Sequence, residues 1–245
     1  MFSGMDRHAA ERAITAEGED GSRDHTAPAE DYLKAIYELE RGGAPAATTA
    51  IAEQLGVAPG SATGMVRRLA EQGLVTHERY HGARLTAAGR SVALRVLRRH
   101  RVLEAYLVQA LGYGWDAVHA EAERLEHAVS DTLIDRMATA IGEPAFDPHG
   151  APIPSREGIV AEARYRALSD VAAGGSAEIM RVEDEDPDLL RYLAERTLVP
   201  GTVVRIVERA PFGGPITLEV GGAAQQVGPA LAERLLVQPR PSAPG

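Results

Sequence analysis

Two histidines and two glutamates recur at helical spacing in one alanine-rich segment of the chain. The sequence His-Ala-Glu-Ala-Glu-Arg-Leu-Glu-His places His119, Glu123, Glu126 and His127 at positions i, i+4, i+7 and i+8. In an α-helix these positions share one face. Imidazole nitrogens and carboxylate oxygens are ligands of divalent metal ions, so this face is a candidate metal site. The alternative is a solvated helix face that binds no ion.

Composition limits the classes of protein to which the chain can belong. Its 245 residues allow one large domain or a few small ones, and 44% apolar with 25% charged residues are typical of a soluble globular protein. No apolar run is long enough to cross a membrane, and the first residues lack the apolar core of a secretory signal. The absence of cysteine excludes disulfides and thiolate ligands or nucleophiles. We therefore expect a cytoplasmic protein with no membrane partner.

Positive charge is concentrated in one part of an otherwise acidic chain. The net charge of the whole chain is −9. Between Pro45 and Arg101, however, nine arginines stand against three glutamates, which gives this segment a net charge of +6. Such a local excess indicates a polyanionic partner that binds this part of the chain.

The same segment has the pattern of a winged helix. Two short helices are predicted over 48–56 and 57–73, followed by a hairpin over 74–86 and a long helix over about 87–110. This order is typical of a winged helix-turn-helix, whose second helix contacts DNA, although the two helices alone would also suit an ordinary helical hairpin. The candidate DNA contacts are Ser61 and Thr63 for bases or phosphates, Arg67 and Arg68 for phosphates, and Arg79 and Arg84 in the wing for the DNA backbone.

The remaining pattern predicts a mainly α protein with a small β domain at its C-terminal end. The polar residues 1–27 are predicted to be disordered, and Pro28 begins the first helix. Two helices are predicted over 115–129 and 130–142, and five short strands with one helix form a small barrel near the C-terminal end. The predicted domains are 28–96 for DNA binding, 97–154 as a helical domain, 155–175 as a linker and 176–240 as the barrel.

Four motifs in this order resemble the DtxR/MntR family of metal-dependent repressors. They are Glu30–Tyr37, Arg99–Glu104, His119–His127 and Phe146–Pro154, and the resemblance covers nearly all of residues 28–240. It implies a winged helix-turn-helix, a helical metal-binding and dimerisation domain, and an SH3-like (FeoA-like) C-terminal domain. It also implies a homodimer that binds double-stranded operator DNA and that has no catalytic residues.

The resemblance implies two metal sites. Asp31, Glu123, Glu126 and His127 match the primary site of the family, and His100, Glu104 and His119 match the second site, to which Asp184 is added from the barrel. Iron-responsive members of the family have Met and Cys at the positions of Asp31 and Glu123. Carboxylates at both positions favour Mn²⁺, with Fe²⁺ as the alternative. Lys34 stands where short manganese regulators have a third carboxylate, so two separate sites are expected.

Three other functions remain open at this point. An iron-dependent regulator of the same family differs only in the metal that it senses. A metal-independent winged-helix regulator would use the histidines in helix-stabilising pairs. A di-metal carboxylate enzyme would need Glu-x-x-His pairs on two helices, and the sequence offers no second copy beside Glu123–His127.

Overall fold

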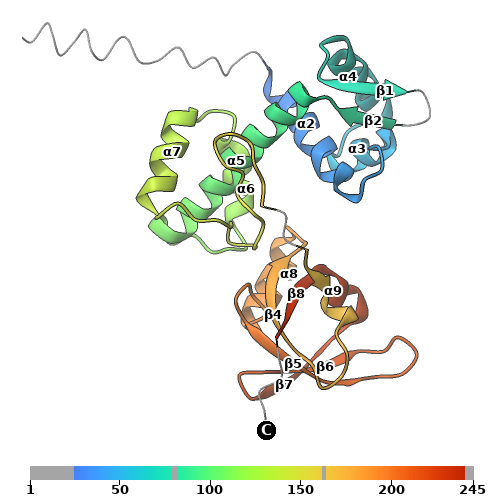
Figure 1. The fold of residues 1–245 in the computed structure, drawn as a ribbon, viewed down its shortest axis with the longest axis vertical. Coiled ribbons are helices and arrows are strands. Elements are labelled where there is room, and N and C mark those ends of the chain that lie inside the picture. Colours follow the sequence, from blue (N-terminus) through green and yellow to red (C-terminus); the bar gives the residue numbers. More distant parts are fainter. Residues whose placement is uncertain (1–24, 79–81, 162–163, 241–245) are drawn as a thin grey trace, which may run out of the picture. The chain divides into compact units, whose positions relative to one another are not determined.

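The computed structural model describes residues 25–78, 82–161 and 164–240, and these form two compact units. The first unit ends at Ala93 and the second begins at Leu94, so the division lies within one continuous helix, α5 (Ala87–Leu111). Most of the predicted disordered extension, residues 1–24, and the candidate DNA contact Arg79 lie outside the described residues. Figure 1 shows the elements in chain order.

The first unit is the expected winged helix-turn-helix. It contains α2 (Ala27–Leu39), the short 3-10 helix η1 (Glu40–Gly42), α3 (Thr48–Gln54), α4 (Pro59–Glu71), and a hairpin of β1 (Val75–Glu78) and β2 (Gly82–Leu85). Pro59 begins α4, where its missing N–H is not needed. Buried side chains from all these helices form one core, which includes Leu33, Ile51 and Leu69. Short helices are only marginally stable on their own, so the burial of these apolar side chains stabilises them in the folded unit.

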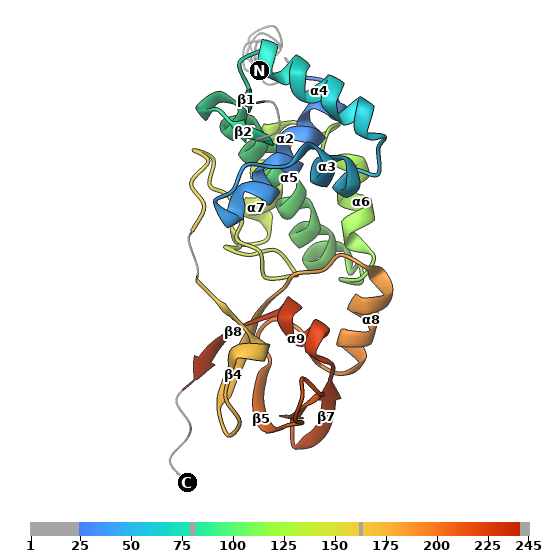
Figure 2. The same ribbon diagram turned by 90° about the vertical axis from the view of Figure 1, so that its right-hand side faces the viewer.

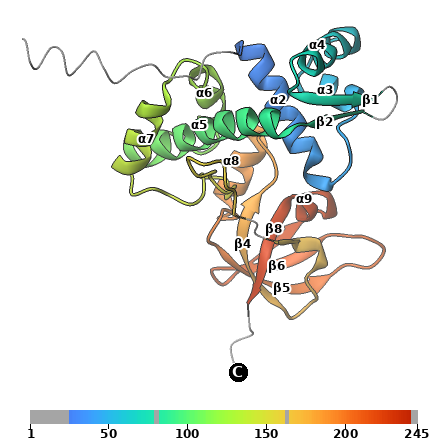
Figure 3. The same cartoon turned by 45° about the horizontal axis from the view of Figure 1, so that its top comes forward.

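In the second unit, two short helices pack against the C-terminal part of α5. Val102 and Leu103 of α5 contact Ala122 of α6 (Val118–Leu125) and Ile134 of α7 (Asp131–Ala140) in a small buried cluster. Figure 3 shows α6 and α7 beside the long helix α5. The hydroxyl of Ser130 accepts a hydrogen bond from the backbone N–H of Leu133 and caps α7, as the sequence predicts.

The helix that carries the histidine-glutamate segment is shorter than predicted. We expected a helix over 115–129, but α6 ends at Leu125, and Glu126 and His127 lie in the turn that follows. The backbone N–H of Ala128 bonds to the carbonyl of Leu125, which tightens this turn. Ser130 has an extended backbone and caps the next helix, so the helical conformation must end before residue 130.

The C-terminal part of the second unit is an antiparallel sheet with the strand order β3-β8-β4-β5-β6-β7. Two helices, α8 (Pro187–Glu195) and α9 (Pro229–Arg234), pack against it through Leu190, Leu193 and Ala232, and Figure 2 shows their positions beside the strands. The strands are β3 (Arg166–Ala167), β4 (Ser176–Val182), β5 (Val203–Arg209), β6 (Ile216–Val220), β7 (Ala223–Val227) and β8 (Leu235–Arg240).

The sheet domain begins earlier than the sequence pattern suggested. β3 and the 3-10 helix η2 (Leu168–Asp170) lie inside the segment 155–175 that we expected to be an irregular linker. Leu168 and Val171 are buried in the core of the sheet, so this segment contributes apolar side chains to the domain. Among the described residues, no helix combines the length and the apolar character that a membrane span requires.

Gly89, at the start of α5, lies so close to the backbone of Leu74 that a side chain there should lower the stability of the first unit. A Cβ atom at Gly89 would lie 1.9 Å from the carbonyl oxygen of Leu74, whereas a Cβ atom at Gly64 in α4 would meet nothing within 4 Å. We expect Gly89→Ala to destabilise the first unit by about 1–3 kcal/mol, because the backbone must move to make room. Gly64→Ala should instead stabilise it by roughly 0.5–1 kcal/mol. Urea unfolding of both variants measures these changes, and equal stability of the two would contradict the close approach.

Candidate metal centres and DNA contacts

His100 of α5 lies at the centre of a buried group of ligand atoms in the second unit. Its Nε2 atom is 3.1 Å from Glu104 Oε1 and 3.1 Å from His119 Nδ1, and the latter two atoms are 3.3 Å apart. Its Nδ1 atom is 2.5 Å from Glu126 Oε2 and 3.6 Å from Glu123 Oε1. The side chain of Glu104 is 2% exposed and that of Glu126 is 0% exposed. Most of the ligands that the sequence analysis proposed therefore converge in one place.

These distances suit a divalent cation. Ligand atoms about 2.1 Å from an ion, and at right angles to one another, lie about 3 Å apart. The triangle of His100 Nε2, His119 Nδ1 and Glu104 Oε1 has this spacing on each side. Each of these atoms can offer a lone pair, and a proton or a cation between them offsets the cost of their burial. The donor set consists of nitrogen and carboxylate oxygen only.

Ligands that we expected for two separate sites lie next to one another in the second unit, and their assignment to two ions stays a prediction. His127 Nε2 lies 3.4 Å from Glu126 Oε1, and the other oxygen of Glu126 contacts His100. His119 Nε2 lies 3.8 Å from Glu123 Oε1. His100 and Glu126 thus connect the predicted second site to the predicted primary site within one continuous cluster.

Two residues that we did not propose as ligands extend the cluster on its other side. Glu104, Asp147 and His149 are all buried, and each offers a ligand atom within 4.8 Å of the others. Asp147 Oδ1 accepts hydrogen bonds of 2.9 Å from the backbone N–H groups of His149 and Ala151, which fixes the carboxylate in a tight turn. Only the Asp-Pro-His spacing before a glycine marks this pair in the sequence, and that pattern alone is common in loops.

Burial and charge alter the proton affinity of this group. Burial alone would raise the pKa of Glu104, but the charge of His100 and hydrogen bonds from three histidines hold that pKa well below its usual range. Burial alone would lower the pKa of His149, yet the hydrogen bond to Glu104 and the negative charges nearby raise it. Burial and the charge of Glu104 raise the pKa of Asp147 against the opposing effect of Arg101. The raised pKa values of Asp147 and His149 favour their protonated forms, and a cation bound there would displace such protons.

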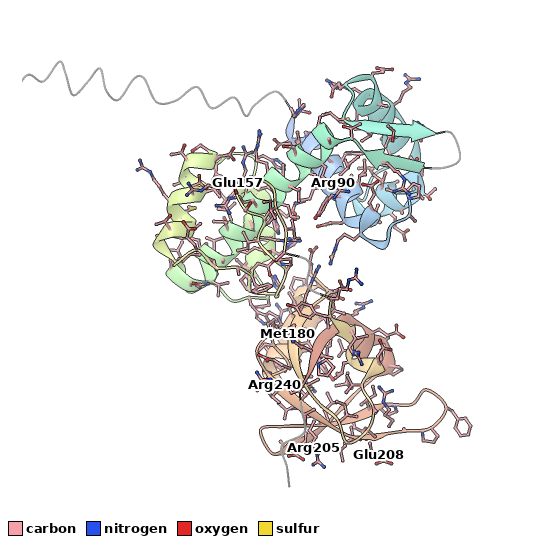
Figure 4. All side chains as sticks on the ribbon, in the orientation of Figure 1. Arg90, Glu157, Met180, Arg205, Glu208 and Arg240 are labelled. Atoms are coloured by element: carbon pink, nitrogen blue, oxygen red, sulfur yellow. The ribbon has the colours of Figure 1, made fainter. Side chains whose placement is uncertain are left out.

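The loop that carries Asp147 and His149 contacts the sheet domain closely. Gly150 has a φ of +85°, and a Cβ atom there would lie 1.9 Å from the carbonyl oxygen of Met180 in β4. The carbonyl oxygen of His149 accepts a hydrogen bond of 2.9 Å from the N–H of Val182. Figure 4 labels Met180 on the sheet. His149 and Gly150 thus connect the candidate ligands to β4 by direct backbone contacts.

In the acidic run before α8, the carboxylate beside His119 is not the one that the sequence suggested. Asp184 forms an ion pair with Arg234 and accepts a hydrogen bond from the N–H of Asp186, so its carboxylate stabilises the local turn. Its neighbour Glu185 places Oε2 3.2 Å from His119 Nε2. The geometry favours Glu185 as the ligand from the sheet domain, and the assignment of Asp184 stays a prediction.

Asp31 lies in the first unit, on α2, and is half-buried there. The other proposed ligands lie in the second unit. Its assignment to the same ion as Glu126 and His127 therefore remains a prediction from the family resemblance.

The candidate DNA contacts of α4 lie on its exposed side. Ser61, Thr63, Arg67 and Arg68 are exposed, while Ala62, Val66 and Leu69 on the other side are buried. Thr63 donates a hydrogen bond to the carbonyl of Pro59, and Arg67 lies 3.6 Å from Glu71. Arg84 lies on β2, with 48% of its side chain exposed. Each described candidate can thus reach a ligand in solution.

Part of the positive charge that suggested a polyanion is neutralised within the fold. Arg99 Nε lies 2.6 Å from Asp131, and Arg98 Nη2 lies 2.9 Å from Asp135. Arg101 donates a 2.6 Å hydrogen bond to the carbonyl of Pro152, and its Nε lies 3.6 Å from Asp147. These arginines of α5 hold the helical part of the second unit together. The arginines available to DNA are therefore fewer than the sequence count suggested.

Three sequence profiles match successive parts of the chain. The N-terminal DNA-binding domain of iron dependent repressors matches residues 24–83, and the metal binding and dimerisation domain of the same repressors matches residues 86–155. The FeoA domain matches residues 166–239.

Relatives of known name and structure cover most of the chain. The iron-dependent repressor IdeR of Mycobacterium tuberculosis is 33% identical over 205 residues, which are 79% of this chain and 88% of the relative. The diphtheria toxin repressor of Corynebacterium diphtheriae is 29% identical over 79% of this chain and 88% of its own length. A solved manganese-dependent transcriptional repressor in complex with manganese is 40% identical and has a TM-score of 0.81, covering 86% of this chain and all of that one. The manganese regulator SloR is 34% identical, with a TM-score of 0.72 over 86% of this chain and 98% of its own.

Two substitutions distinguish between Glu185 and Asp184, the two candidate ligands in the acidic run. Glu185→Gln should weaken Mn²⁺ binding by about tenfold to a hundredfold, because it removes a carboxylate beside His119. Asp184→Asn should leave Mn²⁺ affinity unchanged and cost at most about 1 kcal/mol of stability, because it breaks a partly exposed ion pair. Isothermal titration calorimetry with Mn²⁺ measures both effects. The reverse pattern would show that Asp184 is the ligand and that the contact of Glu185 is incidental.

Proposed function

Because this chain belongs to the DtxR/MntR family of metal-dependent transcriptional repressors, we propose that it is a manganese sensor whose metal-loaded homodimer binds operator DNA. It is a DNA-binding repressor of metal-homeostasis genes and not an enzyme. The metal that it senses, the ligands of that metal and the dimer are the proposed parts. The cytoplasm is the proposed location.

The donor set is the observation that carries the choice of metal. His100, Glu104 and His119 converge with nitrogen and carboxylate oxygen atoms, and Glu126 adds a fully buried carboxylate. The chain contains no cysteine, so no thiolate can contribute. Hard oxygen ligands suit Mn²⁺, whereas softer sulfur ligands favour its competitors. Fe²⁺ remains the alternative, since relatives named for iron and for manganese both match.

The proposed ligands follow from the clusters and from the family. Asp31, Glu123, Glu126 and His127 would hold one ion, as the resemblance implies. The second would be held by His100, Glu104 and His119, with Glu185 as the better placed acidic ligand from the sheet domain. Asp147 and His149 are further candidates on the far side of Glu104. When bound, the cation supplies the positive charge that offsets these buried carboxylates.

The switch that we propose depends on the repulsion between these carboxylates. Glu123 and Glu126 approach His100 from one side, and Asp31 would add a third negative charge. Like charges that converge without a cation cost free energy or take up protons. A metal ion bound by Asp31 of α2 together with ligands of the second unit would therefore order the DNA-binding unit, and this order would be lost without the ion. Coupling free energies between two such sites are about 1–3 kcal/mol.

Glu126 offers the sharpest test of the metal switch. Glu126→Gln keeps the size of the side chain but removes a negative charge from a fully buried ligand. With a duplex selected by the wild-type protein and Mn²⁺ from a random pool, we expect this variant to lose most of the gain in DNA affinity that Mn²⁺ produces, by about tenfold or more. Fluorescence anisotropy with Mn²⁺ and with a chelator measures that gain.

Glu121→Gln is the matched control for this experiment. Glu121 lies in α6, just before the turn that carries Glu126, and it pairs with Arg124 and belongs to none of the candidate ligand groups. It should keep the full response to Mn²⁺. If the Glu126 variant also keeps the full response, the assignment of the ligands is wrong. If the wild-type protein binds DNA equally with Mn²⁺, Fe²⁺ and chelator, the metal-independent winged-helix regulator is the better description.

A further inference from the structure

A buried carboxylate follows α2 directly and lies under the wing of the first unit. The side chain of Glu40, in η1, is only 6% exposed. Both of its carboxylate oxygens lie 3.3 Å from the backbone nitrogen of Leu85 in β2, which donates to them. Oε1 lies 3.8 Å from Arg84 Nη1, and Oε2 lies 3.9 Å from Arg90 Nη2. One carboxylate thus contacts the wing strand and two guanidinium groups.

The two arginines are held on their other sides as well. Arg84 donates a 2.9 Å hydrogen bond from Nη2 to the carbonyl of Gly43. The guanidinium of Arg90, which is labelled in Figure 4, lies 5.3 Å from the centre of the Tyr37 ring. About half of each arginine side chain nevertheless remains exposed, 48% for Arg84 and 51% for Arg90. Their orientation is therefore restrained, while their charge stays accessible to a ligand.

Burial of a carboxylate at this position has a cost that a neutral residue would avoid. Desolvation of an ion is expensive, and replacing a buried ion pair by apolar side chains is often neutral or stabilising. Stability alone therefore does not require Glu40. A second observation concerns the strand itself, because Ala83 pairs with Ala46 through two 2.9 Å backbone hydrogen bonds. Glu40 extends this attachment from Ala83 to the end of β2, the strand that carries Arg84.

We propose that Glu40 is a positioning residue for DNA binding. It holds β2 against the segment that follows α2 and orients Arg84 and Arg90 toward the phosphates of the DNA backbone. This role extends the DNA contacts from Arg84 to Arg90, which the sequence analysis did not propose. The inference rests on the DNA-binding activity of the family and is independent of which residues hold the metal.

This inference is tested by whether removal of the negative charge of Glu40 raises or lowers the affinity for DNA. Removing a negative charge from a DNA-binding unit should by itself strengthen binding to DNA, because repulsion of the phosphates is reduced. Glu53→Gln, at an exposed carboxylate of α3, serves as the matched control for this general effect. Glu40→Gln should do the opposite and weaken binding by about tenfold, because the two guanidinium groups lose their common partner. Both are measured with Mn²⁺-loaded protein, the selected duplex and one fixed salt concentration.

A double-mutant cycle identifies the route of the effect. In a protein that already carries Arg84→Gln and Arg90→Gln, Glu40→Gln should cause little further loss of affinity, because contacting residues are not additive. Circular dichroism and direct titration with Mn²⁺ should show an unchanged fold and metal affinity. Should Glu40→Gln fail to fold, Glu40→Asp decides, since it keeps the charge but shortens the reach and should also weaken DNA binding. Unchanged or tighter binding in a folded Glu40 variant would overturn the proposal.

Discussion

The helical part of the second unit depends on the contacts of one buried imidazole. His100 approaches Glu104 and His119 with one ring nitrogen and Glu126 with the other. Glu104 and Glu126 are buried carboxylates in contact with this ring, and Asp147 is a third buried carboxylate that lies near Glu104. Buried negative charge is tolerated only with compensating positive charge, which protons and Arg101 can supply in part. A divalent cation would supply more charge in the same space, so under the proposed ligand assignment the packing of this domain and its response to metal would have one cause.

The second unit also has a direct connection between this cluster and the sheet. His149 is close to Glu104 on one side and bonds through its backbone to Val182 of β4 on the other. The absence of a side chain at Gly150 lets the loop approach Met180. Glu185, in the acidic run before α8, makes the complementary contact because it reaches His119. Two segments of the sheet domain thus meet the candidate ligands, which gives this domain a physical route to influence metal binding.

The sequence predicted the elements better than it predicted which side chains meet. The helix periodicity, the prolines and the glycines placed α2, α3, α4 and α5 correctly, since these features act locally. Tertiary packing decided the rest. The turn after Leu125 depends on the cap at Ser130, and the early start of the sheet domain depends on the burial of Leu168. His149 and Glu185 join the cluster through contacts between distant segments, which no single pattern in the sequence reveals.

We propose that a divalent metal occupies the ligand cluster around His100. Anomalous diffraction from crystals grown with Mn²⁺, with data collected on both sides of the manganese absorption edge, tests it directly. An anomalous peak is expected between His100, Glu104 and His119, whose ligand atoms lie 3.1–3.3 Å apart in the structure. A well-ordered cluster without such a peak, in crystals that contain Mn²⁺ bound elsewhere on the protein, would contradict this assignment.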